Sequence, residues 1–198
     1  MTTQEKILDT AIKLYNTHGI SKITSRHIAA EMDISPGNLH YHFKHTEDII
    51  KALYDRLVGE YNTFFRELEL TEDVSFADLT NFAQASFKIT TRYRIFFRSG
   101  VDIVMQIPAI RDNLHEIVTK RKTQLGFIFE RLVHKGIFRN DLPPHIWPIL
   151  VEQLFIIGDF WWAHNEITER LKGAKASAKY MELIEGLFTP YLAVKNKN

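Results

Sequence analysis

The spacing of apolar residues constrains this chain more than any other feature, because it is helical over nearly the whole length. In the first segment, apolar residues recur three and four positions apart and build one helix face: Ile7, Leu8, Ala11, Ile12, Leu14 and Tyr15. No alternating pattern of the kind that predicts a strand occurs. The sequence therefore predicts an all-α fold of about nine helices.

Residues that start and stop helices divide the N-terminal part of the pattern. Gly19 is expected to end the first helix, because a glycine adopts positive φ at low cost. Thr24 and Ser35 are expected N-caps of a second and a third short helix, with Pro36 at the first position of the third. Thr46 is the expected cap of a longer fourth helix.

The rest of the chain continues as longer helices. Ser75 and Asp78, three residues apart, predict a capping box at the start of the fifth helix. Pro148 is compatible with a helix only in its first turn, so the eighth helix is expected to begin shortly before it. The later helices are expected at about 92–99, 108–136, 145–170 and 177–194.

Composition excludes several classes of protein. The chain has 198 residues, no cysteine and a formal net charge of +1. Disulfides and cysteine-based sites are therefore impossible, and any DNA-binding surface has to be local. Charges interrupt the apolar stretch at the N-terminus and every long apolar run further on, so we expect no signal peptide, no membrane span and a cytoplasmic protein.

The segment 24–43 is the most informative for function. Two short helices joined by a tight turn form the geometry that places a second helix in the major groove of DNA. If Leu39 and Phe43 point inward, the opposite face of the second helix carries hydrogen-bonding and cationic groups suited to bases and phosphates. The candidate DNA contacts are Thr24, Ser25, Arg26, Ser35, Pro36, Gly37, Asn38, His40, Tyr41, His42 and Lys44.

This segment resembles the TetR family of bacterial transcriptional repressors over about the first sixty residues. Members of that family open with a helix like EKILDTAIKLYNTHG and carry Thr-x-x-x-Ile-Ala before the turn. They continue with Ser-x-Gly-x-Leu-Tyr-x-His-Phe. The matching residues here are Thr24, Ile28, Ala29, Ser35, Gly37, Leu39, Tyr41, His42 and Phe43.

The resemblance implies a repressor that binds a palindromic operator as a homodimer and is released by a small molecule. It implies a DNA-binding domain at 1–61 and a ligand-sensing and dimerisation domain at 62–198, with no cofactor and no metal. Beyond residue 61 the similarity is one of helix pattern and length only. The alternative is a helical protein-interaction module whose hairpin does not act on DNA.

Three positions depart from the family pattern. Asp33 stands where glycine is common in the turn, although Asp also tolerates the left-handed conformation. His40 replaces the usual tyrosine of the recognition helix. His45 and Thr46 stand near the position where a lysine often opens the fourth helix. We therefore expect modest affinity for each half-site and reliance on dimerisation.

Other chemistries find little support. His40 and His42 diverge by about 200° on a helix, so they do not readily share a metal ion. Nucleophile, phosphate-loop and zinc-protease motifs are absent, which argues against an enzyme. The segment 91–99, TRYRIFFRS, is interpreted as a helix that packs its aromatic side chains inward with Arg94 and Arg98 outward. A nucleic-acid patch and an arginine that pairs with an anionic ligand remain alternatives there.

The family resemblance implies that the last two helices form the dimer. In the segment 152–164, EQLFIIGDFWWAH, the aromatic residues are interpreted as interface and core, with a ligand pocket as the alternative. Gly158 suggests a close approach between helices. The candidate interface residues are Leu154, Phe155, Trp161, Trp162, Leu183, Leu187 and Phe188.

A mainly apolar pocket is expected between the fifth, seventh and eighth helices, because aromatic residues concentrate in that part of the chain. The alternative is that the same side chains fill a solid core. A buried carboxylate without a protein cation would favour a cationic ligand, and an arginine turned inward would favour an anionic one. The candidate walls are Phe87, Phe97, Met105, Phe127 and Phe155, and the candidate polar groups are Asp102, Gln106 and Asp159.

Overall fold

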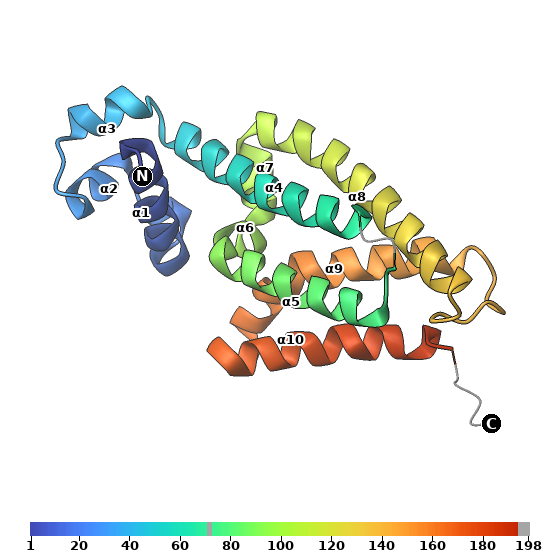
Figure 1. Ribbon diagram of the computed structural model, residues 1–198. Coiled ribbons are helices and arrows are strands. Elements are labelled where there is room, and N and C mark those ends of the chain that lie inside the picture. The colour runs from blue at the N-terminus through green and yellow to red at the C-terminus, as the bar shows by residue number, and fades with distance from the viewer. Residues whose placement is uncertain (71–72, 194–198) are drawn as a thin grey trace.

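The computed structural model describes residues 1–70 and 73–193, and in that part of the chain the all-α fold is confirmed (Figure 1). The described elements comprise ten α-helices, two short 3₁₀ helices and one isolated bridge between Phe138 and Leu192. The helices are α1 (Thr3–His18), α2 (Ser25–Glu31), α3 (Pro36–His42), α4 (Thr46–Leu70), α5 (Phe76–Arg92), α6 (Arg94–Arg98), α7 (Gly100–Gln106), α8 (Pro108–His134), α9 (Ile146–Ile167) and α10 (Gly173–Phe188), with 3₁₀ turns at Ile20–Lys22 and Thr189–Tyr191.

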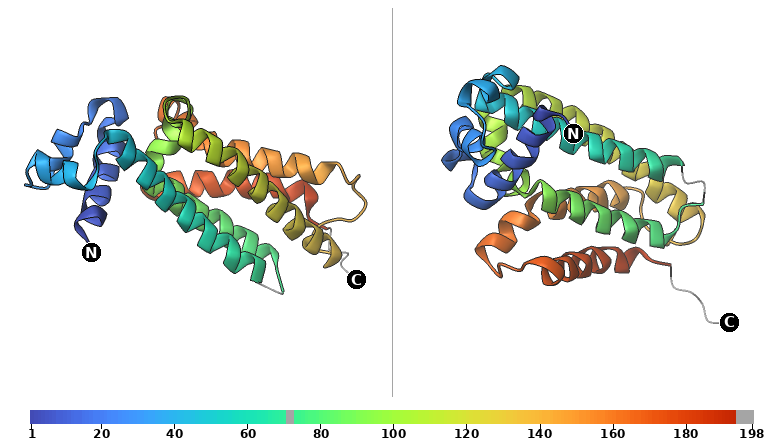
Figure 2. Two further views of the ribbon diagram at one scale, coloured as in Figure 1. Left: turned by 90° about the horizontal axis from the view of Figure 1, so that it is seen from above. Right: turned by 60° about the vertical axis from the view of Figure 1, so that its left-hand side comes forward.

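The helices form two groups connected by α4. Helices α1–α3 gather at one end of the molecule, and α4 runs from them along the larger group (Figures 1 and 2). In that group α4 packs against α8, α8 against α9, and α5 against α10. The short helices α6 and α7 lie between the two groups, where α6 contacts α1 as well as α9.

Most of the expected helix ends are present. Ser75 and Asp78 form the predicted capping box, with the Ser75 N–H donating to the Asp78 carboxylate at 2.8 Å. Pro108 opens α8, and Gly136 ends the turn after it at φ +65°, with the Ile137 N–H bonded to the Leu132 carbonyl at 3.0 Å. Local hydrogen bonding therefore fixes these boundaries, as expected.

Other boundaries differ from the prediction. Helix α4 begins at Thr46 itself, because the Asp48 carboxylate accepts the N–H of His45 at 2.9 Å and makes His45 the capping position. The expected sixth helix is shorter, and a further helix, α7, follows directly at Gly100. The apolar spacing of this stretch is helical throughout, so the break at Ser99 was not recognised.

The two C-terminal helices also end differently. Helix α9 ends at Ile167 rather than near Arg170, which has φ +53°, and the Asn165 side chain closes the turn through the N–H and carbonyl of Leu171. Helix α10 begins at Gly173, four residues before the predicted start. The predicted end near Val194 lies outside the described residues.

One hydrophobic cluster holds the N-terminal helices to the rest of the molecule. It contains the inner faces of α1–α4, including Tyr15 and Leu39, which are fully buried. It also contains Tyr93, Ile95 and Ile110 from α5 to α8. The core of α1–α4 therefore continues across the expected boundary at residue 61.

A second cluster fills the larger group and is rich in aromatic rings. Phe87 stacks on Trp162, with ring centroids 5.6 Å apart, and the Trp162 indole N–H donates to the Thr90 hydroxyl at 3.1 Å. Phe138 is fully buried and lies parallel to Trp147 at 5.5 Å. These aromatic rings make a solid core beside the cavity described below.

Helix α9 is the most apolar helix and is only partly covered. Its 18-residue window of mean hydropathy 1.2 is 22% buried, and by length and composition alone the helix could cross a membrane. It carries Pro148, Glu152 and Asp159, the interruptions on which the sequence argument against a span rested.

We expect Phe138→Ala to destabilise the protein by about 3–5 kcal/mol, because it removes a ring that is in contact with Phe129, Trp147 and Phe188 on several sides. The melting temperature should fall by about 6–20 °C in differential scanning calorimetry. Phe127→Ala is the matched control, because Phe127 is 59% exposed, and its effect should stay within about 0.5 kcal/mol. Equal effects of the two substitutions would contradict this account of the core.

Candidate DNA-binding surface and ligand cavity

Helix α3 presents a polar face away from the core. Leu39 is fully buried and Phe43 is nearly so, as the spacing predicts. Tyr41 is 84% exposed, and its ring meets His42 edge to face at 5.2 Å. The remaining exposed residues of this surface are Ser35, Pro36, Gly37, Asn38, His40 and Lys44.

The turn before α3 fixes the direction of this face. Asp33 has φ +53°, so it adopts the left-handed conformation that favours glycine and that Asp also tolerates. The Ser35 hydroxyl accepts the Asn38 N–H at 3.1 Å, and Pro36 occupies the first helical position, as expected. The turn at Asp33 and the cap at Ser35 together fix the start of α3 and therefore the direction of its polar face.

The start of α2 borders the same surface. Thr24 and Arg26 are exposed, and Ser25 is half-buried. At the third position of α2, His27 Nδ1 accepts the Thr24 N–H at 3.1 Å, so histidine takes the part that glutamate plays in a capping box. Arg26 is left free of the cap and supplies a cation beside α3.

The DNA-binding helices are joined to the larger group through Asn16, near the C-terminal end of α1. Its side chain accepts the Ile95 N–H at 2.9 Å and donates to the Arg92 carbonyl at 2.8 Å. Its backbone carbonyl accepts from Arg94 and Arg98, each at 3.1 Å. Cations at a helix C-terminus are favourable, and here two of them attach α6 to α1.

These contacts correct the expected direction of the two α6 arginines. Arg94 lies over the Trp162 ring at 5.5 Å, and Arg98 pairs with Glu166 at 3.4 Å, so neither extends into solvent as predicted. The carbonyl of Asn16 provides a partly buried acceptor for both guanidinium groups. The sequence cannot show this acceptor, because it lies 78 and 82 residues away along the chain.

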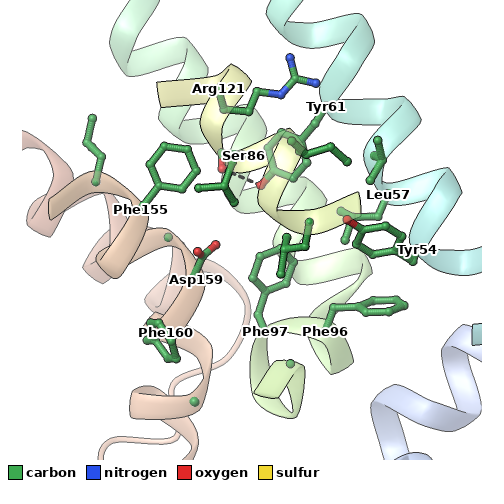
Figure 3. A pocket seen from close by; sticks show the side chains of 18 of the residues that line it. Tyr54, Leu57, Tyr61, Ser86, Phe96, Phe97, Arg121, Phe155, Asp159 and Phe160 are labelled. Carbon is green, nitrogen blue, oxygen red and sulfur yellow. Dashed lines mark hydrogen bonds between the residues drawn. The ribbon is translucent and has the colours of Figure 1, made fainter. Parts of the chain in front are cut away.

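A cavity of about 590 Å³ lies between α4, α5, α8, α9 and α10, with α6 and α7 at one end. This volume falls within the range of about 300–1,000 Å³ typical of small-molecule sites. Figure 3 shows side chains from α4, α5, α6 and α9 converging on the space. The larger group therefore contains both a solid aromatic core and a cavity of ligand size.

The structure brings five of the eight predicted pocket residues to this cavity: Phe97, Asp102, Met105, Phe155 and Asp159. Met105 and Asp102 are exposed. The other three were placed wrongly. Phe87 faces the tryptophans of α9, Gln106 is exposed at the end of α7, and Phe127 lies on the outer face of α8, opposite Leu125 and Phe129.

Several lining residues were not predicted from the sequence. They come from α4, α5, α6, α8 and α10, and α4 is the helix that the sequence assigns to the connection between the two domains. Apolar periodicity identifies the buried face of a helix but does not separate a packed position from one beside an empty space. The lining residues that were missed include Tyr54, Leu57, Tyr61, Phe82, Ser86, Phe96, Arg121 and Tyr180.

Polar groups are few and lie mainly in the middle of the cavity. The hydroxyls of Tyr61 and Ser86 are 3.0 Å apart (Figure 3). Burial raises the pKa of Tyr180 to about 12, and burial likewise raises the pKa of Tyr61. Both phenols are therefore neutral hydrogen-bonding groups at neutral pH.

Asp159 is the cavity's central charged group. Its carboxylate points toward Ser86 in Figure 3, and most of its surroundings are protein even though its surface is accessible. Desolvation raises its pKa to about 6, with a smaller opposing effect of the Lys122 charge. The Asp159 carboxylate is both accessible and desolvated, because its accessible surface faces the cavity. Gly158 beside it meets only the Tyr180 hydroxyl, at an ordinary contact of 3.8 Å for an added Cβ, so the expected close helix approach is absent.

The candidate interface residues divide into buried and accessible ones. Trp161, Trp162 and Phe188 are at most 5% exposed inside one chain, which corrects their assignment to a dimer seam. Leu154 and Phe155 line the cavity instead of the outer face. Leu183 is 38% exposed, and Leu187 is half-buried.

A different stripe of α9 is open to solvent. Its members are four and three residues apart in alternation, the repeat of packed helical bundles. Four of them are large apolar residues between 47% and 78% exposed. The stripe, called here the α9 stripe, consists of Ile149, Gln153, Ile156, Phe160, Ala163 and Ile167, of which Phe160 and Ala163 also border the cavity. The heptad spacing was readable from the sequence, but the aromatic residues on the opposite side of α9 obscured it.

Within residues 1–70 and 73–193, no three His, Asp or Glu side chains gather in a group that could hold a metal ion. His40 is exposed and His42 is half-buried against Tyr41. Their positions suit contacts with a partner surface.

A short two-helix motif with an exposed polar recognition helix, joined to a helical bundle with a cavity, defines the class of helix-turn-helix regulators that carry a ligand-sized chamber. The family model for bacterial regulatory proteins of the tetR family matches residues 7–53, and the model for the bacterial transcriptional repressor TetR matches residues 47–198. The chain belongs to the TetR family of DNA-binding transcriptional regulators.

Individual relatives agree with this assignment. The chain is 25% identical to a TetR-family transcriptional regulator from Marinobacter aquaeolei VT8, with a TM-score of 0.88 over 98% of this chain and 93% of that one. A structure from Saccharomonospora viridis, assigned as a transcriptional regulator and solved in complex with choline, has 17% identity and a TM-score of 0.72 over 94% and 95% of the two chains, and so shows the fold alone.

A curated relative matches over the N-terminal part. It is an uncharacterised helix-turn-helix regulator from Xanthobacter autotrophicus, 38% identical over 52 residues. That match covers 26% of either chain, so the aligned part spans about a quarter of the relative's length. Regulators of the family are soluble DNA-binding proteins, typically non-enzymatic, that bind operator DNA and ligands, typically as dimers.

We expect Tyr41→Ala to weaken operator binding by about 1–3 kcal/mol, because the exposed side chain is placed to meet base edges or phosphates. Lys44→Ala should reduce the slope of log affinity against log salt by about 0.9, the value for one lost phosphate contact. Fluorescence anisotropy with the chain's own upstream DNA, at several salt concentrations, measures both. Unchanged affinity of the two variants at low and at high salt would exclude this face as the DNA-binding surface.

Proposed function

We propose that this regulator is a repressor that binds a palindromic operator as a dimer, and that a small molecule in the cavity releases it. The DNA contacts proposed are those of α2 and α3 named above, with 1–61 as the DNA-binding domain and 62–198 as the sensing domain. The observation that carries the proposal is that α6 borders the cavity and is also bonded to α1, which packs against the helix-turn-helix. Phe97 and Arg98 line the cavity, and Arg98 also bonds to α1.

This arrangement gives a ligand a direct route to the DNA-binding helices. A molecule that displaces Phe97 moves α6, and α6 is tied to Asn16 by two arginines and by the Ile95 N–H. For release, the ligand has to bind more tightly to a conformation in which the spacing of the two recognition helices does not fit the operator than to the conformation that binds DNA. A tenfold loss of operator affinity requires about 1.4 kcal/mol of such preference.

The α9 stripe is the surface proposed for dimerisation, together with Leu183 and Leu187 of α10. A row of exposed large apolar residues along a long helix is unusual for a monomer, and the heptad repeat suits packing against a second helix. Burial in a seam would also explain why α9 is apolar enough to resemble a membrane span. Two recognition helices would then meet half-sites one helical turn or more apart.

Two rival functions are less well supported. A protein-interaction module would not need the exposed polar face of α3 beside a cation at Arg26, and family membership does not favour it. An enzyme would need paired titratable groups in the cavity, whereas Asp159 is accompanied mainly by neutral hydroxyls. We place the regulator in the cytoplasm, where its operator is accessible.

We expect Ile156→Lys to convert the dimer to a monomer, because it puts a charge in the middle of the α9 stripe. Sedimentation at micromolar concentration measures the change, and operator affinity should fall by at least about 100-fold, since one half-site no longer assists the other. Phe127→Lys is the control, an equally exposed apolar position on α8 outside the stripe. A wild-type monomer with intact operator binding would refute the assembly.

We expect Asn16→Ala to uncouple the cavity from DNA, because it removes the two side-chain bonds that join α1 to the junction of α5 and α6. Nile red fluorescence reports occupation of the apolar cavity. In the wild type, saturating operator DNA should weaken Nile red binding by about 5–150-fold. This is because a ligand that weakens DNA binding must itself be bound more weakly, by the same factor, when DNA is present.

In Asn16→Ala the same DNA should change Nile red affinity by less than about threefold while operator binding persists. Thr17→Ala is the control, because the Thr17 hydroxyl bonds only to the Lys13 carbonyl within α1. Nile red affinity in the wild type that is independent of DNA would contradict the proposed coupling.

A further inference from the structure

The charges around the cavity are not equally satisfied by the protein. Four charged residues line it: Arg98, Asp102, Arg121 and Asp159. They come from α6, α7, α8 and α9. The identity of a ligand's charged group depends on which of them lacks a partner and can still be reached from the cavity.

Both arginines have partners within the protein, although the buried Nε of Arg121 has none. Arg98 donates to the Asn16 carbonyl at 3.1 Å and pairs with Glu166 at 3.4 Å. Arg121 is only 4% exposed, donates to Gln124 at 2.6 Å and to Asn62, and lies 4.3 Å from the centre of the Phe65 ring. In Figure 3 its guanidinium lies beside α4 and points away from Asp159. The terminal nitrogens of both guanidinium groups are therefore engaged by the protein.

The two carboxylates differ. Both are accessible, and within the described residues Asp102 also lacks a hydrogen bond or ion pair, but Asp102 lies on α7 at one end of the cavity. Asp159 points into the space between α4, α5 and α9 (Figure 3), and in the described part of the chain no hydrogen bond or ion pair satisfies it. The cation whose charge acts on it, Lys122, forms its ion pair with Glu152 instead. Asp159 is therefore an uncompensated carboxylate that faces a cavity.

The surroundings of Asp159 suit an organic cation. Phe97, Phe155, Phe160 and Tyr61 lie around it in Figure 3, and Tyr180 packs behind Gly158. Aromatic faces attract an ammonium group, most strongly where water is excluded. The rest of the lining is apolar and suits a hydrocarbon body.

We propose that the cavity binds an amphipathic organic cation, with the carboxylate of Asp159 as the counter-ion of its ammonium group and the apolar walls of α4, α6 and α8 around its hydrocarbon part. This inference rests on the proposed ligand-binding function and names the charge class of the ligand. A bound ammonium supplies the counter-ion that Asp159 lacks within the protein. An anion or a neutral molecule leaves that carboxylate buried and unpaired.

The test compares three probes that share a twelve-carbon chain: dodecyltrimethylammonium and dodecanoate below their micellar concentrations, and dodecan-1-ol below its solubility limit. Isothermal titration at pH 7.5 with the full chain, without DNA, measures binding. The wild type should bind the cation at least about tenfold more tightly than the alcohol, and the anion least tightly. Equal affinity for cation and alcohol, preferred binding of dodecanoate, or no binding of any probe would overturn the proposal.

Substitutions assign the effect to one residue. Asp159→Asn, of the same shape, should weaken binding of the cation about tenfold or more and leave the alcohol within twofold. Asp159→Glu should retain part of the preference. Asp102→Asn removes the same charge from the cavity's exposed end and should leave both affinities within twofold. A loss in Asp102→Asn without one in Asp159→Asn would overturn the assignment.

Two further readouts separate charge from folding. Asp159→Asn should melt no lower than the wild type without ligand, because it removes a desolvated charge. Cation binding to the wild type should weaken as the pH is lowered from 7.5 to 5, since the Asp159 pKa is about 6 and the quaternary ammonium does not titrate. That dependence should be absent in Asp159→Asn, and its persistence there would overturn the proposal.

Operator release is measured separately, by anisotropy with each probe. Release by dodecan-1-ol together with no preference for the cation would leave the proposed repressor function standing and would overturn the inference about ligand charge. Cation binding that depends on Asp159 but does not release DNA would support the cation site and count against the proposed function.

Discussion

The C-terminal end of α1 meets the junction of α5 and α6 at Asn16, and the behaviour of the rest of the molecule depends on this contact. The side chain bonds the end of α5 and the start of α6, while its carbonyl holds two arginines of α6. These polar groups are partly buried and satisfy one another, so their bonds favour one relative position of the two parts. The orientation of α3 and the closure of the cavity end therefore depend on the same few bonds.

The N-terminal helices were largely predictable because their boundaries are set by neighbouring residues. The Ser35 cap, Pro36, and the positive φ of Asp33 each act within a few positions of the chain. The inward direction of Leu39 and Phe43 followed from helical spacing alone. Helix caps and turns of this kind can be predicted from neighbouring residues in the sequence, and the family motif depends on the same residues.

The sensing part was less predictable, because its features arise between distant helices. Phe127 and Phe129 are the same residue type two positions apart, yet one is 59% exposed and the other fully buried. Trp161 and Trp162 marked α9 as an interface helix, but they face the protomer's own core, and Ile156 on the opposite side is the accessible one. Composition located the aromatic residues, and only tertiary packing decided which of them surround a cavity.

The hydrophobic cluster that crosses from α1–α4 into α5–α8 has a consequence for how the chain unfolds. Tyr93, Ile95 and Ile110 complete the core of the DNA-binding helices, so those helices do not constitute an independent folding unit. An excised fragment 1–61 would present that apolar surface to water and lose much of its stability. In the intact chain, the DNA-binding helices α1–α3 and the larger helical group would melt in one cooperative transition. A change that protects the amides of one part from hydrogen exchange would also protect those of the other.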